Sequence, residues 1–113
     1  MARGWEFNYK LHAMQVTSHE GSLPSTHSFL SIDGTHVTLT ALKKAEDSNA
    51  LIARFFEWRG EPDKVTLTLP AGAKSATLVN LMEKPEGNPL TITDGKVTVP
   101  IAPYQIQTLR INY

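Results

Sequence analysis

The clearest structural pattern in the sequence is Leu90-Thr91-Ile92-Thr93-Asp94-Gly95-Lys96-Val97-Thr98-Val99. Apolar and polar residues alternate on both sides of Asp94-Gly95, as they do in strands with one buried and one exposed face. The Asp-Gly pair suits the two positive φ angles of a type I′ turn, because both residues tolerate that conformation better than most. The stretch therefore predicts a β-hairpin with its turn at Asp94-Gly95.

Similar runs occur along most of the chain. Val65–Leu69 alternates cleanly and stops at Pro70, and the Asp-Gly pair recurs at Asp33-Gly34 between two further apolar runs. The 12 threonines, six valines and six isoleucines are β-branched residues, which favour strands. We therefore expect a second tight turn at Asp33-Gly34 and strands on both sides of it.

The number of these runs predicts the fold class. About seven or eight strand-like runs are separated by turn residues, and no long stretch shows helical periodicity. The sequence predicts an all-β fold, an antiparallel β-sandwich of immunoglobulin-like general architecture, with a closed barrel as the alternative. Residues 27–113 are expected to form this sandwich. Residues 1–26 are expected to be an extended N-terminal segment, with a candidate strand at 5–9, packed on the domain.

Two further local features can be interpreted. The polar run Lys43–Asn49 is expected to connect two strands. The last run, Tyr104–Tyr113, begins with apolar residues on one face and continues with apolar residues on the other. A change of face along one strand requires an extra residue, so a β-bulge is expected near Gln107–Thr108.

Composition narrows the functional classes. A chain of 113 residues and 12.5 kDa supports one hydrophobic core. Eleven basic and 11 acidic residues give no net charge, so neither a nucleic-acid partner nor a membrane partner is expected. The absence of cysteine excludes disulfides, thiol nucleophiles and iron–sulfur sites. No signal-peptide pattern begins the sequence and no long apolar run interrupts it, so a cytoplasmic location is expected.

The residues that could carry catalysis or bind metal do not form a known pattern. The histidines lie seven to nine positions apart, whereas metal sites use close pairs on one element, and no serine lies in a nucleophile elbow. Glu57, Glu83 and Glu86 could supply a carboxylate pair for glycoside hydrolysis, but Glu83 and Glu86 flank Lys84-Pro85 in what resembles a solvated turn. We therefore predict no catalytic, cofactor-binding or metal-binding residue in this chain. The four histidines are His12, His19, His27 and His36.

The aromatic residues are the remaining candidates for binding. Trp5, Phe7 and Tyr9 are spaced two apart, as are Phe56 and Trp58, so on strands each set would share a face. Such rows stack on sugar rings, dock on other proteins or pack in a core. Trp5, Phe56 and Trp58 are therefore the candidate docking or sugar-stacking surface, with core packing as the alternative.

The run Leu51–Trp58 is apolar on both faces, although a sandwich has only one interior. One face should therefore contribute to an exposed apolar patch that a neighbouring domain or a second copy would cover. In the competing hypothesis, the N-terminal segment folds back and covers this face through Trp5 and Phe7.

Several runs, taken in order, resemble the C-terminal region of α-mannosidases of glycoside hydrolase family 38. The longest is Leu39-Thr40-Ala41-Leu42-Lys43-Lys44-Ala45-Glu46-Asp47-Ser48, followed by Leu51-Ile52-Ala53-Arg54-Phe55-Phe56-Glu57. The others are Asn80–Pro85, Val99-Pro100 with Pro103–Arg110, and, upstream, Glu6–Tyr9 and Leu23–Phe29. The resemblance covers nearly the whole chain.

The resemblance implies a specific role. Enzymes of this family are zinc-dependent, retaining, exo-acting mannosidases whose nucleophile, acid/base and zinc ligands lie in an N-terminal α/β domain. No motif of that domain is present here, so the resemblance implies a non-catalytic C-terminal β-sandwich without a cofactor of its own. The expected partners are the remaining domains of the parent enzyme, with self-association and weak carbohydrate contact as further hypotheses. The alternatives are a free-standing carbohydrate-binding sandwich and an immunoglobulin-like interaction domain.

Overall fold

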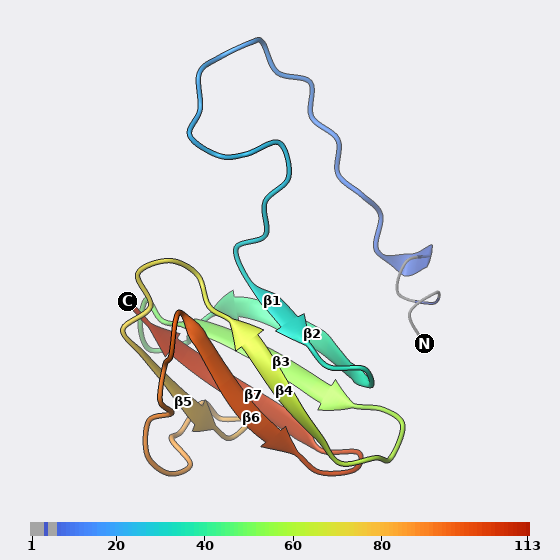
Figure 1. The fold of residues 1–113 in the computed structure, drawn as a ribbon, viewed down its shortest axis with the longest axis vertical. Helices are drawn as coiled ribbons and strands as arrows, with labels where there is room; N and C mark the ends of the chain where they lie inside the picture. Colours follow the sequence, from blue (N-terminus) through green and yellow to red (C-terminus); the bar gives the residue numbers. More distant parts are fainter. Residues whose placement is uncertain (1–3, 5–6) are drawn as a thin grey trace.

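The computed structural model describes residue 4 and residues 7–113. The described residues form seven strands: β1 (Ser31–Asp33), β2 (Val37–Lys44), β3 (Leu51–Glu57), β4 (Asp63–Thr68), β5 (Ser75–Val79), β6 (Lys96–Ile101) and β7 (Ile106–Asn112). All pairings are antiparallel, in a three-stranded sheet of order β1-β4-β6 and a four-stranded sheet of order β2-β3-β7-β5. The sheets lie face to face (Figure 1), which confirms the predicted all-β sandwich and not a barrel.

The core lies between the two sheets and follows the alternation in the sequence. In β6, Val97, Val99 and Ile101 are buried and the residues between them are exposed. β4 and β7 supply buried leucine, valine and isoleucine side chains in the same way, and Phe55 of β3 is the largest fully buried side chain. Strands with one apolar face are stable only when that face is covered, so the alternation requires two packed layers.

The predicted turn at Asp94-Gly95 is confirmed. Asp94 has a φ of 50° and Gly95 a φ of 71°, the two positive angles of a type I′ turn. Thr93 and Lys96 exchange two backbone hydrogen bonds of 2.9 Å across the turn. The conformation that the local sequence predicts is therefore the one that this turn adopts.

Replacing Gly95 with valine is expected to cost about 1–2 kcal/mol of folding free energy, because a β-branched residue is strained at positive φ. No atom lies within 4 Å of the position that a Cβ would take, so backbone strain is the whole effect. Urea unfolding measures it, and Gly87→Val, at a φ of 96° and equally open, is the matched comparison. A neutral effect at Gly95 would contradict the assignment.

The prediction that residues 90–93 form a strand, as the first arm of the hairpin, is wrong. β6 pairs along its whole length with β4, from Asp63↔Ile101 to Thr68↔Lys96. The preceding run instead crosses to the other sheet, where the Leu90 N–H donates to the Ala76 carbonyl of β5 at 2.7 Å.

The strands expected on both sides of Asp33-Gly34 are present as β1 and β2, but they do not pair with each other as a hairpin. β1 pairs with β4 in one sheet, whereas β2 pairs with β3 in the other, so the chain changes sheets here. Gly34 lacks a positive φ, and a Cβ at this position would lie 3.2 Å from the Val37 side chain. The same dipeptide thus gives a hairpin turn at one place and a crossover between sheets at another.

The bulge predicted near Gln107–Thr108 lies elsewhere. β7 is a central strand and pairs in continuous register with both β3 and β5. The register shift occurs in β2 between Leu39 and Ala41, where the Thr40 hydroxyl donates to the Arg54 carbonyl at 3.1 Å. An edge strand has only one ladder to maintain, so it accommodates the extra residue more easily than a central strand does.

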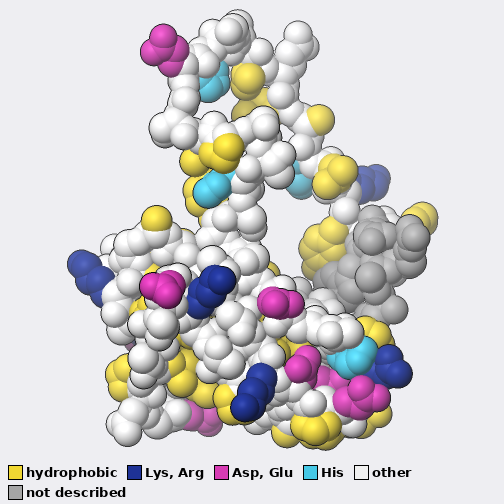
Figure 2. Space-filling view, viewed as in Figure 1, with side chains coloured by type: hydrophobic (Ala, Val, Ile, Leu, Met, Phe, Trp, Pro, Cys, Tyr) yellow, Lys and Arg dark blue, Asp and Glu magenta, His cyan; other side chains and the backbone are white. Residues whose placement is uncertain are grey.

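The N-terminal segment runs away from the sandwich and returns to enter it at β1 (Figure 1). Side chains of residues 7–29 are exposed, and several are apolar (Figure 2). The candidate strand at 5–9 lies partly outside the described residues; Phe7 and Asn8 are helical. No helix in the described part of the chain is long and apolar enough to cross a membrane.

Candidate functional site

The outer face of the four-stranded sheet combines charged and apolar side chains. Alternate residues of β3 point into the core, and the residues between them point outward. β7 lies beside β3 in register and adds to the same face. The outward side chains at the centre of the face are Ile52, Arg54 and Phe56 from β3 and Thr108 and Arg110 from β7.

One end of this face is covered by the loop that joins β2 to β3. The Ala45 N–H donates to the Ala50 carbonyl at 2.8 Å and closes the loop. Ala45 and Ala50 are buried against Ile52, which is fully buried although it lies outside the main core. The run Lys43–Asn49 is thus a connection, as predicted, and it also covers part of the sheet.

Arg110 of β7 holds this loop in place. Its guanidinium donates to both carboxylate oxygens of Asp47, at 2.8 and 3.3 Å, and to the Ser48 hydroxyl at 2.9 Å. Hydrogen bonds from Arg110 lower the pKa of the Asp47 carboxyl and outweigh its desolvation. A two-point contact fixes direction as well as distance, so it orients the loop on the sheet.

A second loop, after β5, reaches the same place from the opposite edge of the sheet. The Asn80 side chain accepts the Met82 and Lys84 N–H groups, which shapes a tight turn. This turn directs Glu83 to the Lys43 ammonium, at 2.8 Å, and to the Glu46 N–H, also at 2.8 Å. Lys43 and the Glu46 N–H hold the pKa of Glu83 below its usual range.

These contacts predict that the two covering loops loosen in acid. Asp47 and Glu83 have lowered pKa values in the folded chain. Their contribution to the stability of the loops is therefore complete above the ordinary pKa range of carboxyl groups and is lost as pH falls through their pKa values in the folded chain. Amide protection of Glu46 and Ala45 should therefore fall below about pH 4. Hydrogen exchange, corrected for its intrinsic pH dependence, measures this loss.

In Glu83→Gln, protection of the Glu46 amide should already be reduced at neutral pH and should depend less on acidity. Glu86→Gln is the control, because Glu86 is exposed and its side chain makes no hydrogen bond or ion pair with the described residues. Unchanged pH dependence in Glu83→Gln would show that this carboxylate does not hold the loops.

The other end of the outer face is apolar and only partly covered. Phe56 pairs with Ile106 of β7; Phe56 is half-buried and Ile106 is 56% exposed. Trp58 follows β3 and is also half-buried, with its ring edge-on to His36 at a centroid distance of 5.5 Å. Phe56 and Trp58 therefore both lie at the end of β3. Trp5, the third residue of the candidate surface, lies outside the described residues.

Glu57, the last residue of β3, is buried and ties two loops together. Its carboxylate accepts the N–H groups of Arg59 at 2.6 Å, Gly60 at 2.7 Å and Tyr104 at 2.9 Å. Burial raises the pKa of Glu57, but these backbone donors outweigh burial and lower it. A carboxylate engaged in this way is a structural anchor.

The other candidates from the sequence are dispersed. His12, His19 and His27 lie in the exposed N-terminal segment, and His36 lies beside Trp58. Among residue 4 and residues 7–113, no group of three His, Asp or Glu side chains is placed to hold a metal ion. Sequence reasoning missed Arg110 and Asn80, because their partners are remote in sequence or are backbone groups that no motif marks.

Comparisons with known proteins complete the description of this site. Searches of curated proteins and of solved structures gave no match. The model of the glycosyl hydrolases family 38 C-terminal beta sandwich domain matches residues 36–109. The matched region contains β2 to β6 and the first part of β7, and it includes both covering loops. β1 lies outside it. This chain therefore belongs to the family of glycosyl hydrolase family 38 C-terminal β-sandwich domains.

Proposed function

We propose that this chain is the non-catalytic C-terminal module of an α-mannosidase and that it supports the packing and assembly of an enzyme that hydrolyses terminal α-mannosides. Family membership supports the enzyme class. The observation that carries the packing role is the apolar end of the outer face, where exposed Ile106 lies beside Phe56. The partners in this proposal are the remaining domains of the parent enzyme.

The state of Glu57 and Glu83, two of the three candidate carboxylates, supports a non-catalytic role. Retaining glycoside hydrolysis needs two carboxyl groups about 5 Å apart that both reach the sugar. Glu57 is fully buried and accepts three backbone N–H groups, and Glu83 is occupied by Lys43 and the Glu46 N–H. Neither carboxylate is placed to meet a substrate.

The polar and apolar ends of the outer face suggest different tasks. Arg110, Asp47 and Glu83 hold two loops over one end, so that end is already covered from within the chain. The end with Phe56 and Ile106 has no such cover among the described residues. A neighbouring domain that covered it would remove apolar surface from water, which is the main favourable contribution to domain packing.

Two measurements test the catalytic part of this proposal. The reading frame upstream of Met1 is expected to encode a family 38 catalytic domain. The 113-residue chain is expected not to cleave p-nitrophenyl α-mannoside, with or without added zinc, whereas the longer protein should cleave it. Turnover by the short chain that disappears in Glu57→Gln or Glu83→Gln would overturn the proposal.

The packing part is tested by Ile106→Ser. Because Ile106 is exposed, this change should leave the unfolding temperature of the short chain unchanged and lower that of the longer enzyme. Leu23→Ser, also exposed but on the N-terminal segment, is the matched control. Equal unfolding temperatures of the wild-type and Ile106→Ser forms of the longer enzyme would argue against a packing role for this surface.

A further inference from the structure

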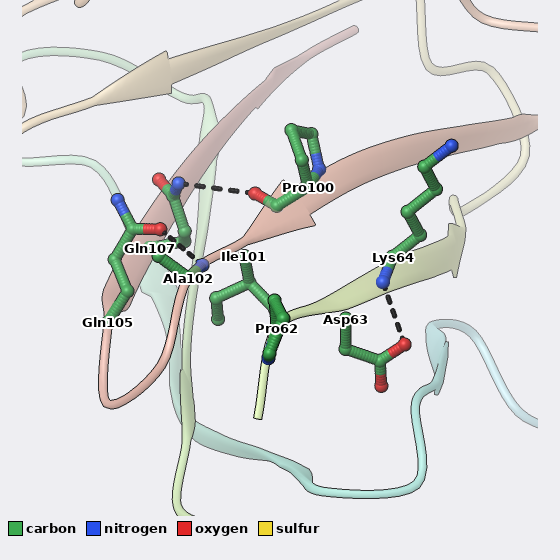
Figure 3. A pocket seen from close by; sticks show the side chains of 8 residues that line it. All are labelled: Pro62, Asp63, Lys64, Pro100, Ile101, Ala102, Gln105 and Gln107. Carbon is green, nitrogen blue, oxygen red and sulfur yellow. Dashed lines mark hydrogen bonds between the residues drawn. The ribbon is translucent and has the colours of Figure 1, made fainter. Parts of the chain in front are cut away.

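A groove of about 790 Å³ lies where the chain passes from one sheet to the other. One wall comes from the start of β4, at Pro62–Lys64, and the base from the end of β6, at Pro100–Ala102. The other wall comes from Gln105 and Gln107, at the start of β7. In Figure 3 the glutamines lie on one side of Ile101 and Pro62, and Asp63 and Lys64 lie on the other.

The polar side chains of the groove each keep a hydrogen-bonding group unused. Gln105 Oε1 accepts the Ala102 N–H at 2.8 Å, and Asp63 Oδ1 accepts the Lys64 N–H at 2.7 Å. Gln107 Nε2 donates weakly to the Pro100 carbonyl at 3.5 Å. Within the described chain, the groups left over are two donors, the Gln105 amide NH₂ and the Lys64 ammonium, and two acceptors, Gln107 Oε1 and Asp63 Oδ2.

Tyr104 directly precedes Gln105 in the loop between β6 and β7. Its φ is 57°, an uncommon angle for a residue with a large side chain, and its N–H is held by the buried Glu57 carboxylate. Its ring packs on Gly60, where a Cβ would come within 2.6 Å of the ring, yet the side chain is 71% exposed. The buried Glu57 carboxylate thus holds Tyr104 in a strained backbone conformation that leaves its ring exposed. Strain of this kind, when it is maintained by the surrounding structure, indicates a binding role.

We propose that this groove, together with the exposed ring of Tyr104 from the neighbouring position, binds a neutral oligosaccharide. Sugars present hydroxyl groups that both donate and accept, and the residues that line the groove offer both unused donors and unused acceptors. They also present C–H faces, which suit the exposed rings of Pro62 and Pro100 and stack on an aromatic ring. One ammonium and one carboxylate leave the groove without net charge, so neither an anion nor a cation is favoured.

The proposal goes beyond the proposed function, because domain packing requires no ligand in this groove. The site is open and shallow, so a dissociation constant of about 1–10 mM is expected, the weak end of specific recognition. The experiment uses the 113-residue chain alone. Its failure would therefore leave the family and the packing role untouched.

The test is a titration of the isotope-labelled chain, followed by NMR, with mannotriose and cellotriose as probes. Saturable shifts are expected in the Gln105 and Gln107 side-chain amides and in the Lys64 backbone amide. No saturable shift with either sugar up to about 50 mM, several times the expected dissociation constant, would overturn the proposal. Saturable shifts of these amides with hexa-alanine and not with the sugars would also overturn it, and would identify a peptide groove.

Variants separate recognition from folding. Gln105→Glu keeps an oxygen to accept the Ala102 N–H but replaces the unused NH₂ donor, so the affinity for sugar should fall at least about fivefold while the loop persists. Gln15→Glu, the same change in the exposed N-terminal segment, should leave the affinity unchanged. Unchanged affinity in Gln105→Glu would show that the sugar binds elsewhere.

Tyr104→Gly provides an independent variant. Glycine adopts positive φ without strain, so the loop should keep its conformation while the ring is lost. The affinity for sugar should fall at least about threefold, because stacking on the ring is removed. An unchanged affinity would contradict a role for the ring.

Discussion

Replacing Glu57 with leucine is expected to lower the unfolding temperature of this domain by more than about 10 °C. Leucine fills the space but accepts no hydrogen bond, so the N–H groups of Arg59, Gly60 and Tyr104 would lose the acceptor that the buried Glu57 carboxylate provides. Each buried N–H without an acceptor carries its full desolvation cost. Differential scanning calorimetry measures the change.

Glu57→Gln should lie between the wild type and Glu57→Leu. One amide oxygen still accepts backbone N–H groups, but the NH₂ group would face donors. Amide exchange at Gly60 and Tyr104 should increase in both variants, which locates the damage at the two tied loops. Glu86→Gln, an exposed carboxylate, should leave the unfolding temperature and these amides unchanged. A Glu57→Leu protein as stable as the wild type would show that the carboxylate is dispensable.

Phe55→Ala and Phe56→Ala are expected to differ in their cost, although the two residues are neighbours on β3. Phe55 is fully buried between the sheets, so its truncation should cost about 3–5 kcal/mol, a large part of a typical domain's stability. Phe56 points to the outer face and is only half-buried, so its truncation should cost about 1 kcal/mol. Urea unfolding of the isolated chain measures both.

The same pair connects stability with the proposed role. In the longer enzyme, Phe56→Ala should cost more than in the isolated chain, because a neighbouring domain would complete the burial of this ring. Phe55→Ala should cost about the same in both settings, since its surroundings lie within the sandwich. Equal costs of Phe55→Ala and Phe56→Ala in the isolated chain would refute the assignment of the two faces.

The resemblance to family 38 enzymes rested on short runs of sequence. In the structure, two of these runs form separate loops with different roles. The run around Lys43–Ser48 forms the loop that covers Ile52, and the run Asn80–Pro85 forms the turn that supplies Glu83. The two runs are joined by the bond between the Glu46 N–H and Glu83, across 37 positions of sequence. Their sequences could be recognised separately, but their contact could not.

Features controlled by near neighbours could be predicted from the sequence alone. Alternation determined which residues of β4 and β6 face the core, because side chains on a strand point alternately to its two sides. The turn at Asp94-Gly95 followed from the φ angles that these two residues tolerate. The all-β class followed from the many alternating runs, and a core between two layers followed from their apolar faces.

Only the tertiary structure decided which strands pair, what role each carboxylate has and where a groove forms. β6 pairs with β4 along its length and with the preceding run only at Thr93–Lys96. Asp33-Gly34 lies at a crossover between sheets, and the bulge lies in edge strand β2, not in central strand β7. Glu57, a candidate for catalysis by its residue type, became a buried anchor because the chain brought three N–H groups to it. The physical reason is range: alternation and φ preferences act within a few residues, whereas sheet pairing, burial and hydrogen bonds between distant loops depend on which segments meet when the core is formed.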